Sequence, residues 1–212
     1  MALPRHRSVL ATALFACMIA AALPAAAQPS LRSTFPGRRI GGATRGECSS
    51  RLIAHLVPAD SVYASGESRL LAILQGPSLN PQPLQLSFSA AAEAATAAAP
   101  TTLLPASGLG LVLFRQPATG VPLRWVSSYQ CEQGSATASD DPLAFVSAGS
   151  PPAISLLLAG SSSEFLPLQK LLQQISQACG GTVSRDLISS RFGFTDLINA
   201  DWPAQLPVRC VF

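Results

Sequence analysis

The sequence has little charge, few aromatic residues and a single lysine. Charged residues make up 12% of the 212 residues and aromatic residues 6%, and Lys170 is the one lysine. The metal-binding patterns Cys-x-x-Cys and His-x-x-Glu-His do not occur, and neither does the dinucleotide-binding spacing Gly-x-Gly-x-x-Gly. The sequence therefore indicates no zinc or other metal site and no bound cofactor.

The first residues have the three parts of a secretory signal. Two arginines and no acid lie within 1–8, an unbroken apolar run covers 9–23, and Ala25 and Ala27 form a small-x-small cleavage site. The apolar run of about 15 residues is shorter than the ~20 that a membrane-spanning helix needs. We therefore expect 1–27 to be a signal peptide, removed after Ala27, and no transmembrane segment to remain.

Export places the mature protein in the periplasm or outside the cell. A lipid anchor on Cys17 is the alternative, but the bulky Phe15 and the apolar residues that follow Cys17 argue against it. The segment 1–27 carries two of the 14 basic residues and none of the 11 acids, so the net charge falls from +3 to about +1. A charge so close to zero gives no reason to expect nucleic acid as a partner.

Four cysteines remain after removal of the signal: Cys48, Cys131, Cys179 and Cys210. An even number of cysteines in an oxidising compartment is typical of disulfide bonds. Four cysteines allow three pairings, and their spacing alone does not select one.

The mature chain is long enough for one domain with a sizeable core. We expect a flexible lead-in at 28–36 and a single secreted domain at 37–212, β-rich over 37–158 and helix-containing over 159–212. Short apolar or alternating segments, separated by Pro, Gly and Ser, predict strands at 51–57, 69–75, 84–88, 108–114, 123–131, 143–147, 153–159 and 206–212. Such a series predicts a mainly β fold: an antiparallel β-sandwich, immunoglobulin-like in general architecture.

One amphipathic helix is predicted at about 164–179, with Ser163 as its N-cap and Gly180 at its end. Its apolar residues recur every three or four positions: Phe165, Leu168, Leu171, Leu172, Ile175 and Ala178. This helix leaves an α+β fold as the alternative. We expect a short helical turn within 194–203, and a loop with fractional helix in the alanine-rich run 90–99.

The stretch GRRIGGATRGEC at 37–48 is rich in glycine and arginine. Its spacing approaches that of a phosphate-binding loop, but Ala43 stands where a lysine would neutralise the phosphates. Nucleic-acid binding would need aromatic residues among the arginines, and only Phe35 is near. By default we expect a solvated turn here. If the stretch has a function, four arginines are the candidate contacts for an anionic surface or polysaccharide: Arg38, Arg39, Arg45 and Arg51.

No catalytic residue can be assigned from the sequence. The stretch 160–164 has the strand–turn–helix context of a nucleophile elbow, but Glu164 replaces the required glycine. That fold also orders its triad Ser, acid, His, whereas His55, the single histidine after residue 27, precedes these serines. A lone histidine within a strand is more often packed or at the surface than catalytic, and Ser163 is better explained as a helix cap.

Two stretches resemble a known family. GRRIGGATRGEC at 37–48, followed by LIAHLVP at 52–58, resembles the start of domain of unknown function 928, a family of exported proteins found mostly in cyanobacteria. LRWVSSYQC at 123–131 resembles that family's tryptophan-bearing strand, which ends in cysteine. The family's aromatic middle strand has no counterpart at 70–80, and the alanine-rich run looks like an insertion.

The resemblance implies a secreted β-rich domain and no particular activity. It also implies a disulfide pairing, because Cys48 and Cys131 lie in the two matching stretches. Pairing these two cysteines leaves Cys179 to pair with Cys210.

Two functional hypotheses follow. The first, which we favour because no catalytic pattern is present, is a non-catalytic envelope or secreted binding or structural module whose partner is an envelope protein or a polysaccharide. The second is an envelope hydrolase that acts on glycan or another polymer through carboxylates that the sequence does not identify. A cleft with two acids about 5–10 Å apart would favour the hydrolase, and a flat face without paired acids would favour the binding module.

Overall fold

The computed structural model describes residues 31–42, 51–92, 100–117, 119–130 and 151–212. Several sequence predictions lie outside the described residues: the signal peptide 1–27 with Cys17, the candidate contact Arg45, Cys48, Cys131, the strand 143–147 and most of the alanine-rich run. Of the helices in the described ranges, none has both the length and the apolar character needed to cross a membrane.

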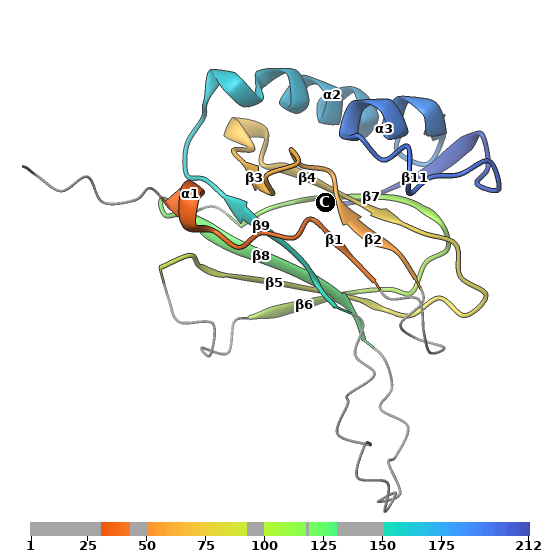
Figure 1. The fold of residues 1–212 in the computed structure, drawn as a ribbon, viewed down its shortest axis with the longest axis horizontal. Helices are drawn as coiled ribbons and strands as arrows, with labels where there is room; N and C mark the ends of the chain where they lie inside the picture. Colours follow the sequence, from red (N-terminus) through yellow and green to blue (C-terminus); the bar gives the residue numbers. More distant parts are fainter. Residues whose placement is uncertain (1–30, 43–50, 93–99, 118, 131–150) are drawn as a thin grey trace, which may run out of the picture.

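Two packed β-sheets with a layer of helices on one of them make up the fold (Figure 1). The larger sheet has six strands in the order β1 (Ile40–Gly41), β2 (Ile53–His55), β4 (Leu70–Gln75), β7 (Gly110–Arg115), β11 (Gln205–Val211) and β10 (Thr182–Ser184). The smaller sheet has five, in the order β3 (Val62–Tyr63), β9 (Ala153–Leu157), β8 (Leu123–Tyr129), β5 (Leu84–Ala90) and β6 (Thr101–Leu104). Short helices precede β1 and β4: α1 (Leu31–Thr34) and η1 (Gly66–Ser68).

The helical layer covers the face of the larger sheet that is turned away from the smaller sheet (Figure 1). It consists of η2 (Ser163–Phe165), α2 (Leu166–Ser176) and α3 (Arg185–Phe192). The central strands of the larger sheet are therefore covered on both faces, and all six residues of β4 are buried. This explains why β4 and β7 are continuous apolar runs, whereas β8 alternates between buried and half-buried residues.

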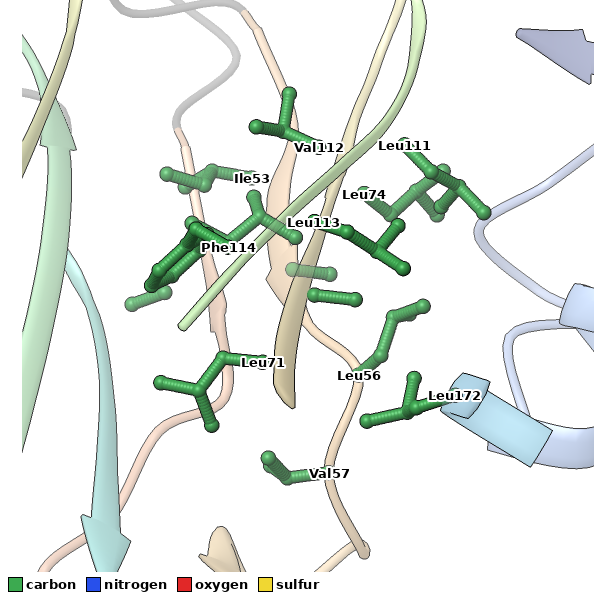
Figure 2. Close-up of a cluster of buried hydrophobic side chains, with 14 of the residues drawn as sticks. Ile53, Leu56, Val57, Leu71, Leu74, Leu111, Val112, Leu113, Phe114 and Leu172 are labelled. Carbon is green, nitrogen blue, oxygen red and sulfur yellow. The ribbon is translucent and has the colours of Figure 1, made fainter. Parts of the chain in front are cut away.

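The core fills both spaces between the three layers. Figure 2 shows Leu172 of α2 beside Leu56 on the helical side of the larger sheet, and Phe114 on its other side. The ring of Phe114 meets that of Trp125 of β8 edge-on, with ring centroids 5.6 Å apart. The sheets are thus joined by large apolar side chains, whose burial is the main stabilising contribution in a fold of this kind.

The mainly β sandwich is confirmed, but its strands are not all antiparallel as predicted. β3 pairs with β9 and β11 pairs with β7 in parallel, while the other pairs are antiparallel. A parallel pair requires a connection that returns the chain to the same end of the sheet. Between β7 and β11 the chain passes through β8 and β9 of the smaller sheet and then through the helical layer, which leads it back to the larger sheet.

The C-terminal helix is confirmed near its predicted position, but its start differs. Ser163 lies in the 3₁₀ turn η2 rather than at a cap, and α2 begins after Phe165 with Pro167 in its first turn. A second helix, α3, was not predicted, because only Ile188, Ser189 and Phe192 of its eight residues are buried and its apolar stripe is weak. The predicted turn within 194–203 occurs as hydrogen-bonded turns, including the bond from Ile198 N–H to the Phe194 carbonyl.

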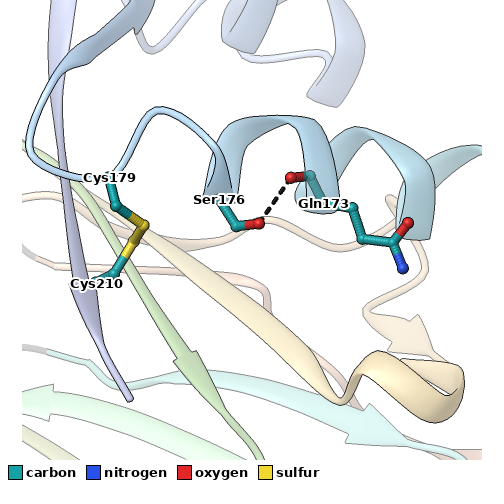
Figure 3. Close-up of a disulfide and its surroundings, with 4 residues drawn as sticks. All are labelled: Gln173, Ser176, Cys179 and Cys210. Atoms are coloured by element: carbon teal, nitrogen blue, oxygen red, sulfur yellow. Dashed lines mark hydrogen bonds between the residues drawn. A yellow bond between two sulfur atoms is a disulfide. The ribbon is translucent and has the colours of Figure 1, made fainter.

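A disulfide joins Cys179, after the end of α2, to Cys210 of β11, as predicted (Figure 3). Their Cα atoms are 5.7 Å apart, within the usual range for a disulfide. The bond ties the last strand of the larger sheet to the helical layer. The pairing of Cys48 with Cys131 stays a prediction, which peptide mapping without reduction can test.

Candidate functional sites

The described candidate arginines do not form one surface. Arg38 is exposed and donates through Nη2 to the carbonyl oxygen of Pro152, 3.1 Å away. Arg39 lines a groove beneath the helices, and Arg51 is buried at only 4% exposure. The sequence predicted that these arginines share one face that contacts an anionic partner. That prediction is wrong for Arg51, because its side chain is buried. The backbone around these residues turns at Gly42, whose φ of +96° favours glycine.

The groove that contains Arg39 is rich in basic side chains. It has a volume of about 730 Å³ and lies between the helical layer and the loop that follows β2. Three cationic side chains line it, Arg39 before β1, Lys170 on α2 and Arg191 on α3, and no acid is among its described lining residues. Its remaining walls are largely apolar: Val57, Pro58, Ala59, Pro167, Leu168, Leu171 and Phe192. We call this site the basic groove.

The three cations of the basic groove differ in mobility. Arg39 donates through Nη1 to the carbonyl oxygen of Val57 at 2.7 Å, and its guanidinium carbon lies 4.7 Å from the centre of the Phe194 ring. Burial lowers the pKa of Arg39, although the charge of Asp60 partly opposes this effect. Lys170 and Arg191 are exposed. The groove thus combines one fixed guanidinium with two cations at its rim that can adjust to a ligand.

A pair of carboxylates does occur among the described residues, but outside this groove. Arg32 lies between Asp60 and Glu164 and bonds to each at 2.7 Å. The two acid side chains are 42% and 52% exposed, and the hydrogen bond from Arg32 lowers the pKa of Glu164. A glycosidase acid needs a raised pKa. The arrangement therefore fits an ion-paired surface anchor for α1 better than a catalytic pair.

His55 is packed in the core, at 0% exposure, between the two sheets. Its Nδ1 lies 2.7 Å from Ser155 Oγ and its Nε2 2.8 Å from Ser127 Oγ, and its ring stacks on Trp125 with centroids 3.4 Å apart. A neutral imidazole donates through one nitrogen and accepts through the other, so both serines satisfy it. Burial lowers the pKa of His55 well below its ordinary value.

This histidine–serine network is sealed from solvent, since Ser127 and Ser155 are also at 0% exposure. Neither serine belongs to the stretch 160–164 that resembled a nucleophile elbow. The network can position the two sheets relative to each other, but it offers no route for a substrate.

Two members of the basic groove were also missed by sequence reasoning. Lys170 was noted as the single lysine, within the predicted helix, but no role was assigned to it. Arg191 could not be placed, because α3 was not predicted. No family model, no curated protein and no solved structure matches this chain. The resemblance to domain of unknown function 928 therefore stays a prediction, and the function is argued from the sites themselves.

Proposed function

We propose that the protein is a non-catalytic, exported binding module that holds an acidic segment of a partner protein in the basic groove. One observation carries this proposal: Arg39, Lys170 and Arg191 converge on one groove from three separate parts of the fold, without a described acid among them. Clustered cations attract anionic partners and discriminate against cationic ones.

The walls of the groove favour a peptide over a polysaccharide. Leu168 and Leu171 of α2, which are half-buried, give the groove aliphatic surface between its cations. Burying such surface is favourable only against another apolar group, which an aliphatic side chain supplies and a polar saccharide does not. The single aromatic lining residue, Phe192, is 5% exposed and offers little ring surface to a sugar. The proposed ligand is therefore an acidic segment with interspersed apolar side chains.

The partner is placed in the cell envelope or outside the cell because the sequence predicts a signal peptide at 1–27. The binding role is preferred to the hydrolase because Arg32 neutralises the exposed Asp60–Glu164 pair, and because the basic groove has no described carboxylate to act as acid or base.

Binding of defined peptides tests the proposal. The probe is a fluorescein-labelled peptide of alternating Glu and Leu, followed by anisotropy at 0.15 M salt. Two comparison peptides carry Gln for every Glu, or Ser for every Leu. We expect the Glu–Leu peptide to bind most tightly, and its affinity to fall as the salt concentration rises.

Variants connect this binding to the groove. Lys170→Gln and Arg191→Gln change exposed side chains, so the fold should be retained while the combined variant binds the Glu–Leu peptide at least tenfold more weakly. Arg124→Gln, on β8 of the other sheet, is the matched control and should bind normally. Equal binding of all three peptides, or tighter binding of an acidic polysaccharide such as alginate, would contradict the proposal. Turnover of cell-wall glycan that is abolished by Glu164→Gln would establish the hydrolase instead.

A further inference from the structure

A gap of about 280 Å³ lies between the edges of the two sheets. Leu84 of β5 and Leu104 of β6 line it from the smaller sheet, and Val112 of β7 with Arg209 and Val211 of β11 line it from the larger sheet. We call this space the inter-sheet gap. Its volume is near the lower end of the range for small-molecule pockets, about 300–1,000 Å³.

Arg209 is the one charged residue among the described residues that line the inter-sheet gap. Its Nη2 donates to two neutral acceptors, the carbonyl oxygen of Gly108 at 2.7 Å and Oε1 of Gln75 at 3.2 Å. Its buried Nε has no partner. Burial lowers the pKa of Arg209, and no carboxylate in the described part of the chain pairs with it. The wall of the gap therefore carries a positive charge that the described residues do not neutralise.

Arg51 brings a second such charge close to the first. Its Nε donates to the carbonyl oxygen of Gly76 at 2.8 Å, and its guanidinium lies over the ring of Tyr129, but Nη1 and Nη2 are buried without acceptors. Burial lowers the pKa of Arg51, and the charge of Arg209 lowers it further. Tyr129 connects the two arginines, because its side chain interacts with Gln75 and with the charges of both Arg51 and Arg209.

Among the described residues, no negatively charged hydrogen-bond acceptor is paired with this cluster. Of the seven buried side-chain N and O atoms without a partner in the described structure, four are donors of this cluster: Arg51 Nη1, Arg51 Nη2, Gln75 Nε2 and Arg209 Nε. Buried donors are normally satisfied, and a buried cation beside a half-buried one is unfavourable without an anion. An anionic group would supply both the acceptor and the charge.

We propose that the inter-sheet gap binds a small amphiphilic anion, whose apolar body lies against Leu84, Leu104 and Val112 and whose anionic head accepts hydrogen bonds from Arg209. Arg51, behind Arg209, adds to the positive potential at the head. The disulfide at Cys210 fixes β11, the strand that carries Arg209, against the helical layer. This site is separate from the basic groove, so the inference does not depend on the proposed function.

Titration with defined amphiphiles tests this inference. The probe is octanoate, measured by calorimetry with the purified, oxidised protein at neutral pH and constant ionic strength. Octan-1-ol carries the apolar body without charge, and sulfate carries the charge without an apolar body. We expect octanoate to bind at least tenfold more tightly than either. Octyl phosphate, measured in the same way, distinguishes a phosphate head from a carboxylate head, and tight binding of either amphiphile supports the site.

Variants and spectra locate the binding. Arg209→Met keeps an apolar stem and should weaken octanoate binding at least tenfold, with octan-1-ol little affected, whereas Arg209→Lys should retain part of the affinity. Arg124→Met is the control, and Lys170→Gln should also bind octanoate normally. Methyl NMR of the wild-type protein should show octanoate-induced shifts at Leu104, Val112 and Val211, which keeps the test valid if the Arg209 variants do not fold.

Three results would each overturn the inference. If octan-1-ol binds as tightly as octanoate, the negative charge of the head group does not contribute to binding. Sulfate that binds as tightly would show that the apolar walls contribute nothing. Methyl shifts confined to the basic groove, or no binding of any probe, would show that the inter-sheet gap is not a ligand site.

Discussion

Acidification should destabilise the protein mainly through one buried residue, His55. In the folded state burial holds the pKa of His55 well below its ordinary value, while in the unfolded chain it titrates near 6.5. The unfolded state therefore binds more protons below pH 6.5. The contribution of the neutral His55 side chain to the free energy of unfolding is fully present above pH 6.5. It is lost as the pH falls toward the folded-state pKa of His55.

The size of this loss in unfolding free energy follows from the isolation of the His55 ring. His55 is at 0% exposure, its two nitrogens face Ser127 and Ser155, and its ring face meets Trp125, so no described charged group stabilises a proton there. While the folded-state ring stays neutral, each pH unit below 6.5 costs about 1.4 kcal/mol. Between pH 7.5 and pH 5 the free energy of unfolding should fall by about 2 kcal/mol.

Urea unfolding at pH 7.5, 6.5, 5.5 and 5.0, followed by the fluorescence of the buried Trp125 and Trp202, measures this loss. His55→Asn can still bond to a serine but cannot titrate, so it should be less stable at pH 7.5 and much less sensitive to pH. The lowered pKa of Glu164 keeps that carboxylate ionised over most of this range, so it adds little to the slope. An equal fall in stability for the wild type and His55→Asn would refute the reasoning.

Two further predictions concern stability. Replacing Cys179 and Cys210, 31 residues apart in the sequence, by serine should lower the free energy of unfolding by about 3–4 kcal/mol in urea, and a change below 1 kcal/mol would show that the cross-link does not restrain the unfolded chain. Gly110 has φ of +136°, and a Cβ there would lie 2.4 Å from the carbonyl oxygen of Pro207, so Gly110→Ala should cost about 2 kcal/mol or more by thermal unfolding. At Gly108 a Cβ meets no atom within 4 Å, so Gly108→Ala should be nearly neutral, and equal losses in the two variants would contradict the steric argument.

The sequence was sufficient to predict the long strands because each carries its own signal. β8 alternates along 123–129, and β4 is a continuous apolar run. The short strands β1, β3 and β10 have two or three residues each, too few to show any period, and they exist because longer neighbours pair with them. The sequence also did not predict which strand pairs are parallel, because strand direction depends on the path that the chain takes between the paired strands.

The sites were less predictable than the fold, for a physical reason. The glycine-rich, arginine-rich sequence suggested a single basic face for contact with an anion. Arg39 comes just before β1 and Arg51 just before β2, however, and the two side chains enter different environments. The residues that complete each site, Arg191 and Arg209, come from segments more than a hundred positions away. No local sequence pattern predicts that residues so far apart in the chain come together in one site. The disulfide between Cys179 and Cys210 could be predicted, because these two cysteines remained once the resemblance had implied the pairing of Cys48 with Cys131.

The position of β11 in the larger sheet determines when folding can finish. β11 lies between β7 and β10, and its residue Val208 pairs with Leu111, almost a hundred positions earlier. Until β11 has been synthesised, β7 presents an open edge in the middle of the sheet, and an unpaired central edge is prone to associate with other chains. Contacts over such sequence distances also slow folding. The sheet can therefore reach its native state only after synthesis of β11, and deletion of 205–212 should leave a protein that aggregates.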